Sequence, residues 1–179
     1  GLRMQLSEIL NDLTYYGRGP EENYRDRRTS QFIGEYTTPI KDLYEPYIRP
    51  QENEHRTDIY WCALTTKQKA GLLFIADRTF ELNASNYLLG SLDSGETIDN
   101  GAPRTNETNH RHLTDPQPVK QVDMFIDYRM MGVGGDNSWG AIAHEPYLIR
   151  PGVENAIEYG FSIVPFDKKA DYKNLIYQY

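Results

Sequence analysis

The sequence predicts an antiparallel, all-β sandwich with one or two short helices. Short segments in which apolar and polar residues alternate recur along the chain, whereas apolar residues at helical spacing are scarce. Clusters of Gly, Pro, Asn and Asp separate these segments, as expected for turns between strands. The chain has 179 residues, which is enough for one domain with a hydrophobic core.

Alternation predicts three strands in the first half of the chain. The first is 2–6, so the chain begins inside or close to a strand. Two more, 57–66 and 70–82, flank the polar turn 66–69 and predict a β-hairpin.

The second half of the chain continues with strand-like segments. Residues 119–135 read as a strand that enters a glycine-rich turn, and 146–152 and 155–166 read as two further strands. The tail 167–179 is charged and ends in apolar residues. Two outcomes are open for it, namely fraying or docking through Leu175, Ile176 and Tyr177.

Two proline-containing segments interrupt the strands. In 17–28 a proline is followed by two glutamates, which suits the first turn of a helix and predicts a short helix. The segment 38–55 contains three prolines and is expected to be an ordered, irregular crossing. The motifs PEENY and PQENE share a Pro-x-Glu-Asn core, whose Asn is expected to fix each loop by hydrogen bonds to the backbone.

Composition excludes several classes of partner. The net charge is −7, with 26 acidic residues against 19 Lys and Arg, so no nucleic-acid partner is expected. The longest apolar run, 70–76, is strand-sized, so no membrane partner is expected. The single cysteine, Cys62, cannot form an internal disulfide and lies in a predicted strand, which favours a buried structural thiol.

The glycine-rich loop MGVGGDNSWG, residues 131–140, is the strongest candidate for a functional site. Gly134 and Gly135 permit backbone angles closed to other residues, and Asp136 and Asn137 can hydrogen-bond their own backbone. Trp139 would therefore be held on a rigid loop. Two interpretations of Trp139 are equally open: its indole stacks on the apolar face of a sugar ring, or it closes one end of the core.

Histidines and carboxylates give weaker signals. His110 and His112 share a face if their segment is a strand, and His144 and Glu145 follow the glycine-rich loop. This set could hold a metal or act as an acid and base, but ordinary hydrogen-bonded or surface histidines are favoured. We therefore assign no metal ligand and no catalytic residue to this chain.

Four motifs occur in an order typical of one family. They are YYGRGPEENYRDR (15–27), LYEPYIRPQEN (43–53), NHRHL (109–113) and DYRMMGVGGDNSWG (127–140). Together they resemble the C-terminal domain of the glycoside hydrolase family 2 β-galactosidases of the lac operon type, over about residues 2–165. The resemblance implies a galactose mutarotase-like supersandwich of two twisted antiparallel sheets.

The resemblance also implies how the chain is organised. Residues 1–166 would form part of that C-terminal domain, with a polar loop or insertion at 83–109, and 167–179 would be a tail. In the family, the catalytic glutamates and the magnesium and sodium sites lie on a (β/α)8 barrel that this chain lacks, so no cofactor is expected here. The expected partners are that barrel and the other domains of the same parent chain, and the parent would be oligomeric and located in the cytoplasm or periplasm.

One residue carries over to the sugar site. Trp139 matches the family tryptophan that reaches into the barrel's pocket and forms a platform for the β-galactoside and its aglycone. Gly134, Gly135, Asp136 and Asn137 would then support that platform. Arg18, Asp26 and Arg27 are expected to form ion pairs that fix their turn. One departure is Glu54, which stands where the family usually has glycine, so that loop is expected to bend differently.

Two other functions remain open. The first is a free-standing carbohydrate-binding module that stacks Tyr and Trp on sugars. The second is an aldose mutarotase-like epimerase that uses His110 or His112 with a carboxylate such as Glu145. A sandwich fold alone does not discriminate among the three.

Overall fold

The computed structural model describes residues 1–48, 50–92, 116–137, 140–150, 152 and 156–178. Its strands are β1 (Leu2–Ser7), β2 (Asp12–Gly19), β3 (Phe32–Pro39), β4 (Arg56–Thr65), β5 (Gly71–Ser85), β6 (Gln121–Asp127) and β7 (Phe161–Phe166). The helical elements are one turn long: η1 (Ile40–Asp42), α1 (Leu89–Leu92), η2 (Glu145–Tyr147), α2 (Tyr172–Leu175) and η3 (Ile176–Gln178). The all-β prediction with a few short helices is thus confirmed.

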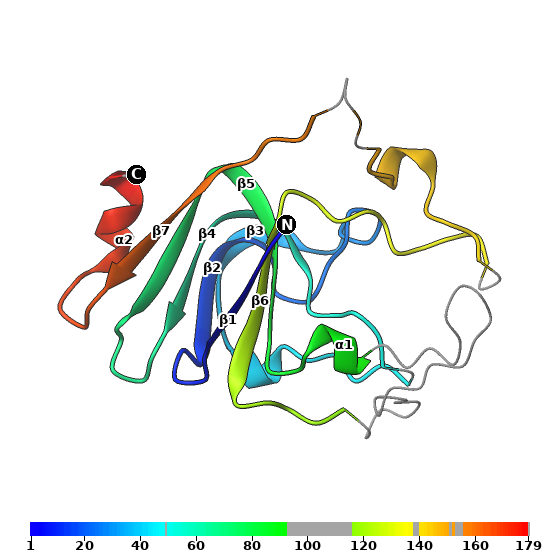
Figure 1. Ribbon diagram of the computed structural model, residues 1–179. Coiled ribbons are helices and arrows are strands. Elements are labelled where there is room, and N and C mark those ends of the chain that lie inside the picture. Colours follow the sequence, from blue (N-terminus) through cyan, green and yellow to red (C-terminus); the bar gives the residue numbers. More distant parts are fainter. Residues whose placement is uncertain (49, 93–115, 138–139, 151, 153–155, 179) are drawn as a thin grey trace.

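Hydrogen bonds join these strands into one antiparallel sheet in the order β1-β6-β5-β4-β2-β3, with β7 paired to β5 (Figure 1). The long strand β5 holds the sheet together. Its first part, residues 71–76, pairs with β7, and its second part, residues 81–85, pairs with β6. Between them β5 bends, and the register of its pairing with β4 shifts between Arg56 and Trp61.

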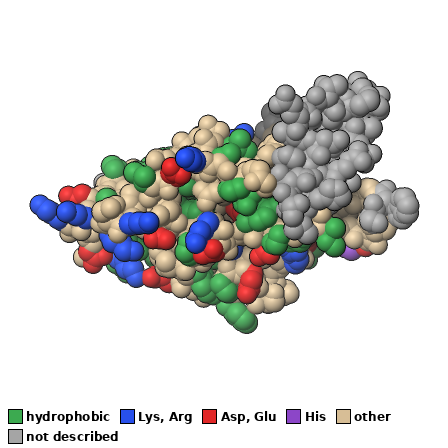
Figure 2. All heavy atoms as spheres, turned by 90° about the horizontal axis from the view of Figure 1, so that it is seen from below, with side chains coloured by type: hydrophobic (Ala, Val, Ile, Leu, Met, Phe, Trp, Pro, Cys, Tyr) green, Lys and Arg blue, Asp and Glu red, His purple; other side chains and the backbone are tan. Residues whose placement is uncertain are grey.

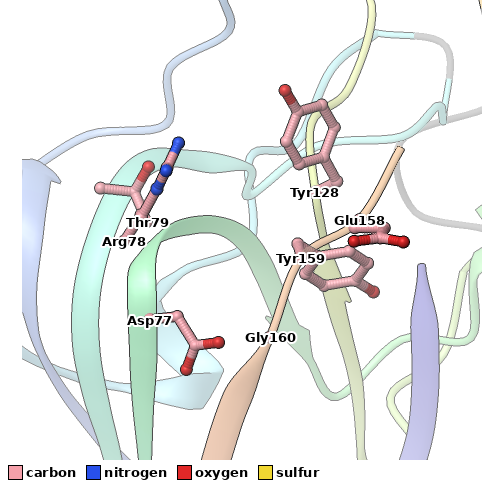
Figure 3. A pocket seen from close by; sticks show the side chains of 7 residues that line it. All are labelled: Asp77, Arg78, Thr79, Tyr128, Glu158, Tyr159 and Gly160. Atoms are coloured by element: carbon pink, nitrogen blue, oxygen red, sulfur yellow. The ribbon is translucent and has the colours of Figure 1, made fainter. Parts of the chain in front are cut away.

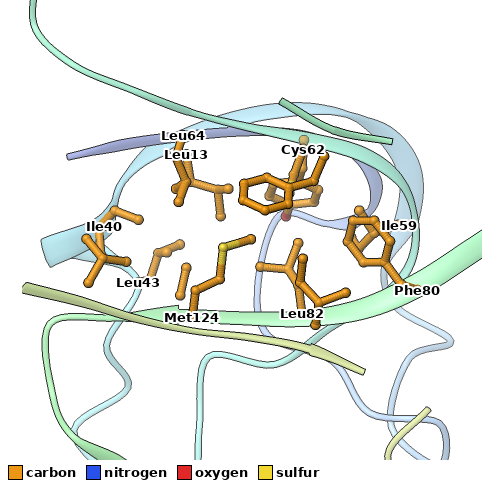
Figure 4. Packing of buried hydrophobic residues seen from close by; sticks show 14 residues of the cluster. Leu13, Ile40, Leu43, Ile59, Cys62, Leu64, Phe80, Leu82 and Met124 are labelled. Carbon is orange, nitrogen blue, oxygen red and sulfur yellow. The ribbon is translucent and has the colours of Figure 1, made fainter. Parts of the chain in front are cut away.

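The bend folds the sheet over its main hydrophobic core, as in a sandwich. Figure 4 shows Leu13, Cys62 and Leu64 on one side of this core and Leu82 and Met124 on the other. All five are completely buried. Their alternation with outward-facing neighbours places them on one face of each strand, which accounts for the period-two pattern of the sequence.

A smaller apolar cluster lies on the opposite face of β4, β5 and β7. It contains Trp61, Leu73 and Val164, and the C-terminal segment packs against it. Leu175 and Ile176 take part in this contact, whereas Tyr177 is 88% exposed. The tail therefore docks, through two of its three expected residues.

The strand predictions are mostly confirmed. The hairpin is formed by β4 and β5. β1 covers the predicted segment 2–6 and ends one residue later, and β6 lies within 119–135. β7 occupies the second half of 155–166. The strand predicted for 146–152 is wrong, because this segment opens with the short helix η2, whose Pro146 cannot donate to a ladder, and residues 148–150 form no strand.

The predicted helix within 17–28 is also wrong. Residues 24–27 form a tight turn closed by an isolated bridge between Tyr24 and Arg27. The Asn23 side chain donates to the carbonyls of Arg18 and Glu21, at 3.0 and 3.1 Å, and its oxygen accepts from the Thr57 amide at 3.1 Å. Such bonds compete with helix formation.

Asn53 has the same role in the second Pro-x-Glu-Asn motif. Its oxygen accepts from the Glu45 amide at 3.1 Å, and its amide nitrogen donates to the Gln51 carbonyl at 2.9 Å. The expected loop-fixing asparagines are thus confirmed in both motifs.

Charged side chains of both signs are interspersed over the face seen in Figure 2. None of the helices in the described part of the chain has the length and apolar character needed to span a membrane. The outer strand β3 exposes apolar side chains, with Phe32 exposed to 72% and Ile33 to 38%.

Candidate functional site

The glycine-rich loop follows β6 and leads to η2. Residues 131–137 and 140 are described, whereas Ser138 and Trp139 lie outside the described residues. Apart from the buried Gly132, the described part is exposed, with Met131 at 43% and Val133 at 52%, and Ile142 just after the loop is 64% exposed.

A remote carboxylate holds the middle of this loop. Asp26 accepts hydrogen bonds from the backbone amides of Val133, at 3.2 Å, and Gly134, at 2.8 Å. Hydrogen bonds to a charged acceptor are stronger than neutral ones and fix the amides in direction. Asp26 lies in the tight turn after β2, so this turn and the loop are joined over more than a hundred residues of sequence.

A second carboxylate holds the start of the loop. Glu81, on β5, accepts from the Met130 amide at 2.6 Å and from His55 Nε2 at 2.9 Å. His55 is completely buried, and its Nδ1 faces the oxygen of Asn83 at 2.7 Å. The Asn83 nitrogen in turn donates to Glu52 at 2.8 Å, which sets the orientation of the amide.

Both nitrogens of His55 therefore face acceptors, as an imidazolium requires. Burial alone would lower the pKa of His55, but its hydrogen bond to Glu81 and the charge of that carboxylate outweigh burial and raise the pKa. The start of the loop thus rests on a buried ion pair.

A cleft of about 530 Å³ lies beside the contact between the loop and the turn after β2, and residues of both line it. Tyr24 stacks on the His55 ring, with centroids 5.3 Å apart, and Arg27 lies over the same tyrosine at 5.1 Å. Arg27 also pairs with Glu22, and the Tyr24 hydroxyl donates to Glu52 at 2.8 Å. These lining side chains already bind one another, so they support the loop and are not free to bind a ligand.

Two glycines of the loop allow neighbouring atoms to lie close to the loop backbone. A Cβ at Gly135 would lie 2.4 Å from the carbonyl oxygen of Ala141, and a Cβ at Gly132 would lie 2.6 Å from Asp26 Oδ2 and 2.9 Å from the Cβ of Ala143. Of the loop glycines, Gly140 has the positive φ, at 96°. Asp136 contacts His144 Nε2 at 2.8 Å.

Two of the three residues expected to form ion pairs around the turn after β2 do so. Arg18 pairs with Asp58, and Arg27 pairs with Glu22. Asp26 differs, because it accepts hydrogen bonds from the loop amides of Val133 and Gly134. Arg28 joins Arg18 on Asp58, at 2.8 Å.

The residues of the acid–base alternative are not brought together in the described structure. His110 and His112 lie outside the described residues. Glu145 is exposed and pairs with Arg150 at 2.8 Å, and the hydrogen bond from Arg150 lowers its pKa. A lowered pKa makes Glu145 a weaker base. Within the described ranges, no three His, Cys, Asp or Glu side chains are grouped to hold a metal ion.

Glu54 occupies a position where the family usually has glycine. Its φ is 68°, in the left-handed region that favours glycine, so the backbone takes the conformation that a glycine would take. The expected difference in the bend of the loop stays a prediction, because this φ describes Glu54 alone. The side chain is 2% exposed, and Ser85 donates to one of its oxygens at 3.0 Å. Burial raises the pKa of Glu54 to about 8, against the opposing effects of Ser85 and Arg56.

Sequence patterns did not reveal three of the residues that hold the loop, Asp26 as an amide acceptor, His55 and Glu81. Glu81 lies on the strand β5 with 4% exposure, and a glutamate inside an apolar strand pattern was the available signal that it has a buried partner. The link from Asp26 to the loop depends on tertiary proximity and has no local signature.

Comparison with known proteins identifies the family of this chain. The β-galactosidase small chain family matches residues 1–163. The chain is similar to β-galactosidases of Priestia megaterium (33% identity over 149 residues) and Streptococcus thermophilus (30% over 150), each match covering 83% of this chain and 13% of the relative. It is also 27% identical over 163 residues to that of Staphylococcus xylosus, covering 91% of this chain and 14% of the relative. The chain thus spans about an eighth of the length of the relatives it matches, and it belongs to the β-galactosidase small chain family.

Proposed function

We propose that this chain is a non-catalytic part of a retaining β-galactosidase and lends the loop 131–140, with Trp139, to the sugar and aglycone site of the complete enzyme. The family match and the shared name of the relatives support the enzyme class. The hydrolysed substrates would be terminal β-D-galactosides, and the partners would be the catalytic barrel and the other domains of the parent.

One observation carries the loop's role. Two carboxylates on distant elements, Asp26 and Glu81, hold the backbone amides of residues 130, 133 and 134. An exposed loop held at its base in this way is preorganised, which lowers the ordering cost when it contacts a ligand. Its apolar rim of Met131, Val133 and Ile142 suits contact with another domain.

The test is the Trp139→Ala variant of the complete enzyme. Loss of a stacked aromatic is expected to weaken glucose and aglycone binding by roughly tenfold and to reduce transfer to sugar acceptors. Formation of the galactosyl-enzyme should change less, and Trp139→Tyr should restore part of the loss. Unchanged acceptor binding in Trp139→Ala would reject this role of the loop.

The non-catalytic part of the proposal has its own test. The purified chain is expected not to hydrolyse a nitrophenyl β-galactoside, because the described residues around the loop are engaged in holding it. Turnover by the purified chain, retained after rigorous repurification, would show that it contains catalytic residues.

A further inference from the structure

A second cleft, of about 490 Å³, opens where β5 bends. Residues 77–79, 128 and 158–160 line it, and it shares no lining residue with the cleft beside the glycine-rich loop. Its volume is within the range of small-molecule sites, roughly 300–1,000 Å³. Figure 3 shows the two tyrosines and Glu158 on one side of the cleft, facing Asp77, Arg78 and Thr79 on the other.

Backbone hydrogen bonds fix the two walls. The Asp77 amide donates to the Gly160 carbonyl at 3.0 Å, next to the paired residues Ala76 and Phe161 of β5 and β7. A Cβ at position 160 would lie 2.2 Å from Asp77 Oδ2. Glycine at this position therefore lets the Asp77 carboxylate lie against the strand, at the floor of the cleft.

The aromatic wall is preorganised. Tyr159 donates its hydroxyl to the carbonyl of Ile126 at 3.0 Å, so its ring cannot rotate away. The ring is held between Tyr128, at 6.2 Å between centroids, and Phe161, at 6.1 Å. Both tyrosines are half-buried, which leaves part of each ring accessible from the cleft.

The polar groups of the cleft are available for a ligand. Asp77, Arg78 and Glu158 are exposed, and within the described ranges their side chains form no hydrogen bond or ion pair. This distinguishes the cleft from that beside the loop, where Arg27 and Glu52 are already bound to protein groups. Two carboxylates can accept hydrogen bonds from hydroxyl groups, and the guanidinium can donate to hydroxyl or ring oxygens.

The combination of groups selects one ligand class. Aromatic rings pack against the apolar face of a sugar, while carboxylates and a guanidinium bind its hydroxyls. A phosphate-bearing ligand would meet two carboxylates on a chain of net charge −7. A metal ion is not favoured, because no three His, Cys, Asp or Glu side chains in the described part of the chain are grouped to bind one. We infer that this cleft binds a neutral saccharide of one or two rings, independently of the glycine-rich loop.

The inference can be tested by titrating the isotope-labelled 179-residue chain with lactose and with galactose, followed by NMR. Saturable shifts are expected at the amides of residues 128 and 158–160. Tyr128→Ala should weaken binding by roughly tenfold, and Glu158→Gln should weaken it several-fold. The matched control is Tyr60→Ala, which removes an exposed tyrosine outside the cleft, one that contacts Tyr16, and should leave the affinity unchanged.

Further variants separate the possible outcomes. If Tyr128→Ala does not fold, the exposed Glu158→Gln and Asp77→Asn variants decide the matter. Trp139→Ala should retain binding, so a failure of the proposed loop function would leave this result unaffected. The inference is overturned if no shift at these amides saturates at sugar concentrations on the order of 0.1 M, or if binding disappears in Trp139→Ala but survives in Tyr128→Ala.

Discussion

The apolar core and the polar layer beneath the glycine-rich loop are held together in different ways. The core consists of side chains such as Leu13, Phe74 and Met124, which are fully buried and lie on one face of their strands. The polar layer consists of His55, Glu81 and their neighbours. His55 and Glu81 are also buried, but they depend on directed hydrogen bonds. Apolar packing tolerates substitutions of similar volume, whereas a buried polar group left without its partner is costly.

The largest loss of stability is expected in the apolar core. Phe74→Ala removes a fully buried ring and should lower the free energy of unfolding by about 3–5 kcal/mol. Urea denaturation measures the change. Ile163 is opposite Phe74 on β7 but is 46% exposed, so Ile163→Ala is the matched control and should cost much less.

In the polar layer, Glu81→Gln removes the charge that balances His55. We expect a loss of about 1–3 kcal/mol near pH 6, because the Gln oxygen can still accept one hydrogen bond. The folded-state pKa of His55 is raised above 6.5, so its stabilising contribution is fully present below pH 6.5 and is lost as the pH rises through that pKa. The difference between the variant and the unsubstituted chain should therefore shrink at higher pH, and a difference that grew with pH would contradict the assigned ion pair.

Glu54 should show the reverse effect, since this residue destabilises the polar layer. Its pKa is about 8 in the folded chain against an ordinary 4.5, so the cost of burial is absent below pH 4.5 and grows as the pH rises toward 8. Glu54→Gly also suits the φ of 68° and should stabilise the chain by about 1–2 kcal/mol above pH 8.

Thermal unfolding of this variant at pH 5 and pH 8.5 measures the effect, which should be smaller at pH 5. Glu54→Gln separates the two causes, because it removes the titration and retains the positive φ. Equal gains at both pH values would leave backbone strain as the cause.

The smallest effect is expected at the exposed end of the layer. Asp26→Asn leaves one oxygen to accept a hydrogen bond but removes the charge, so the loss should be about 1 kcal/mol. Hydrogen exchange should quicken at the amides of Val133 and Gly134, which bind Asp26, and remain unchanged in β4. Exchange that quickens equally in β4 would indicate global destabilisation.

The same contrast explains what the sequence could predict. The hairpin β4–β5 was predictable because its apolar residues alternate over a length typical of strands. β2 and β3 were missed because their glycines resemble turn signals. Gly17 and Gly34 instead face each other across the two strands, and a Cβ at Gly17 would lie 2.4 Å from the Ile59 side chain. Gly17 is therefore required by close packing from a third strand, β4, which no local pattern encodes.

The loop was predictable as a feature, but its support was not. Its glycines, Asp136 and Asn137 stand out in the sequence, whereas the residues that hold it come from the turn after β2 and from β5. Glu54 is a second example. The resemblance identified it as a position where the family usually has glycine, but only the structure shows its positive φ. Hydrogen bonds between distant segments depend on the completed fold, so patterns within a segment cannot predict them.

Cys62 is the chain's single thiol, lies at the centre of the apolar core with no exposed surface, and has a pKa raised by burial. A thiol-reactive reagent can therefore modify it when the strands around it separate. The rate at which Cys62 is labelled would therefore report how often the core opens, and it can be measured in a cell extract as well as in a purified sample.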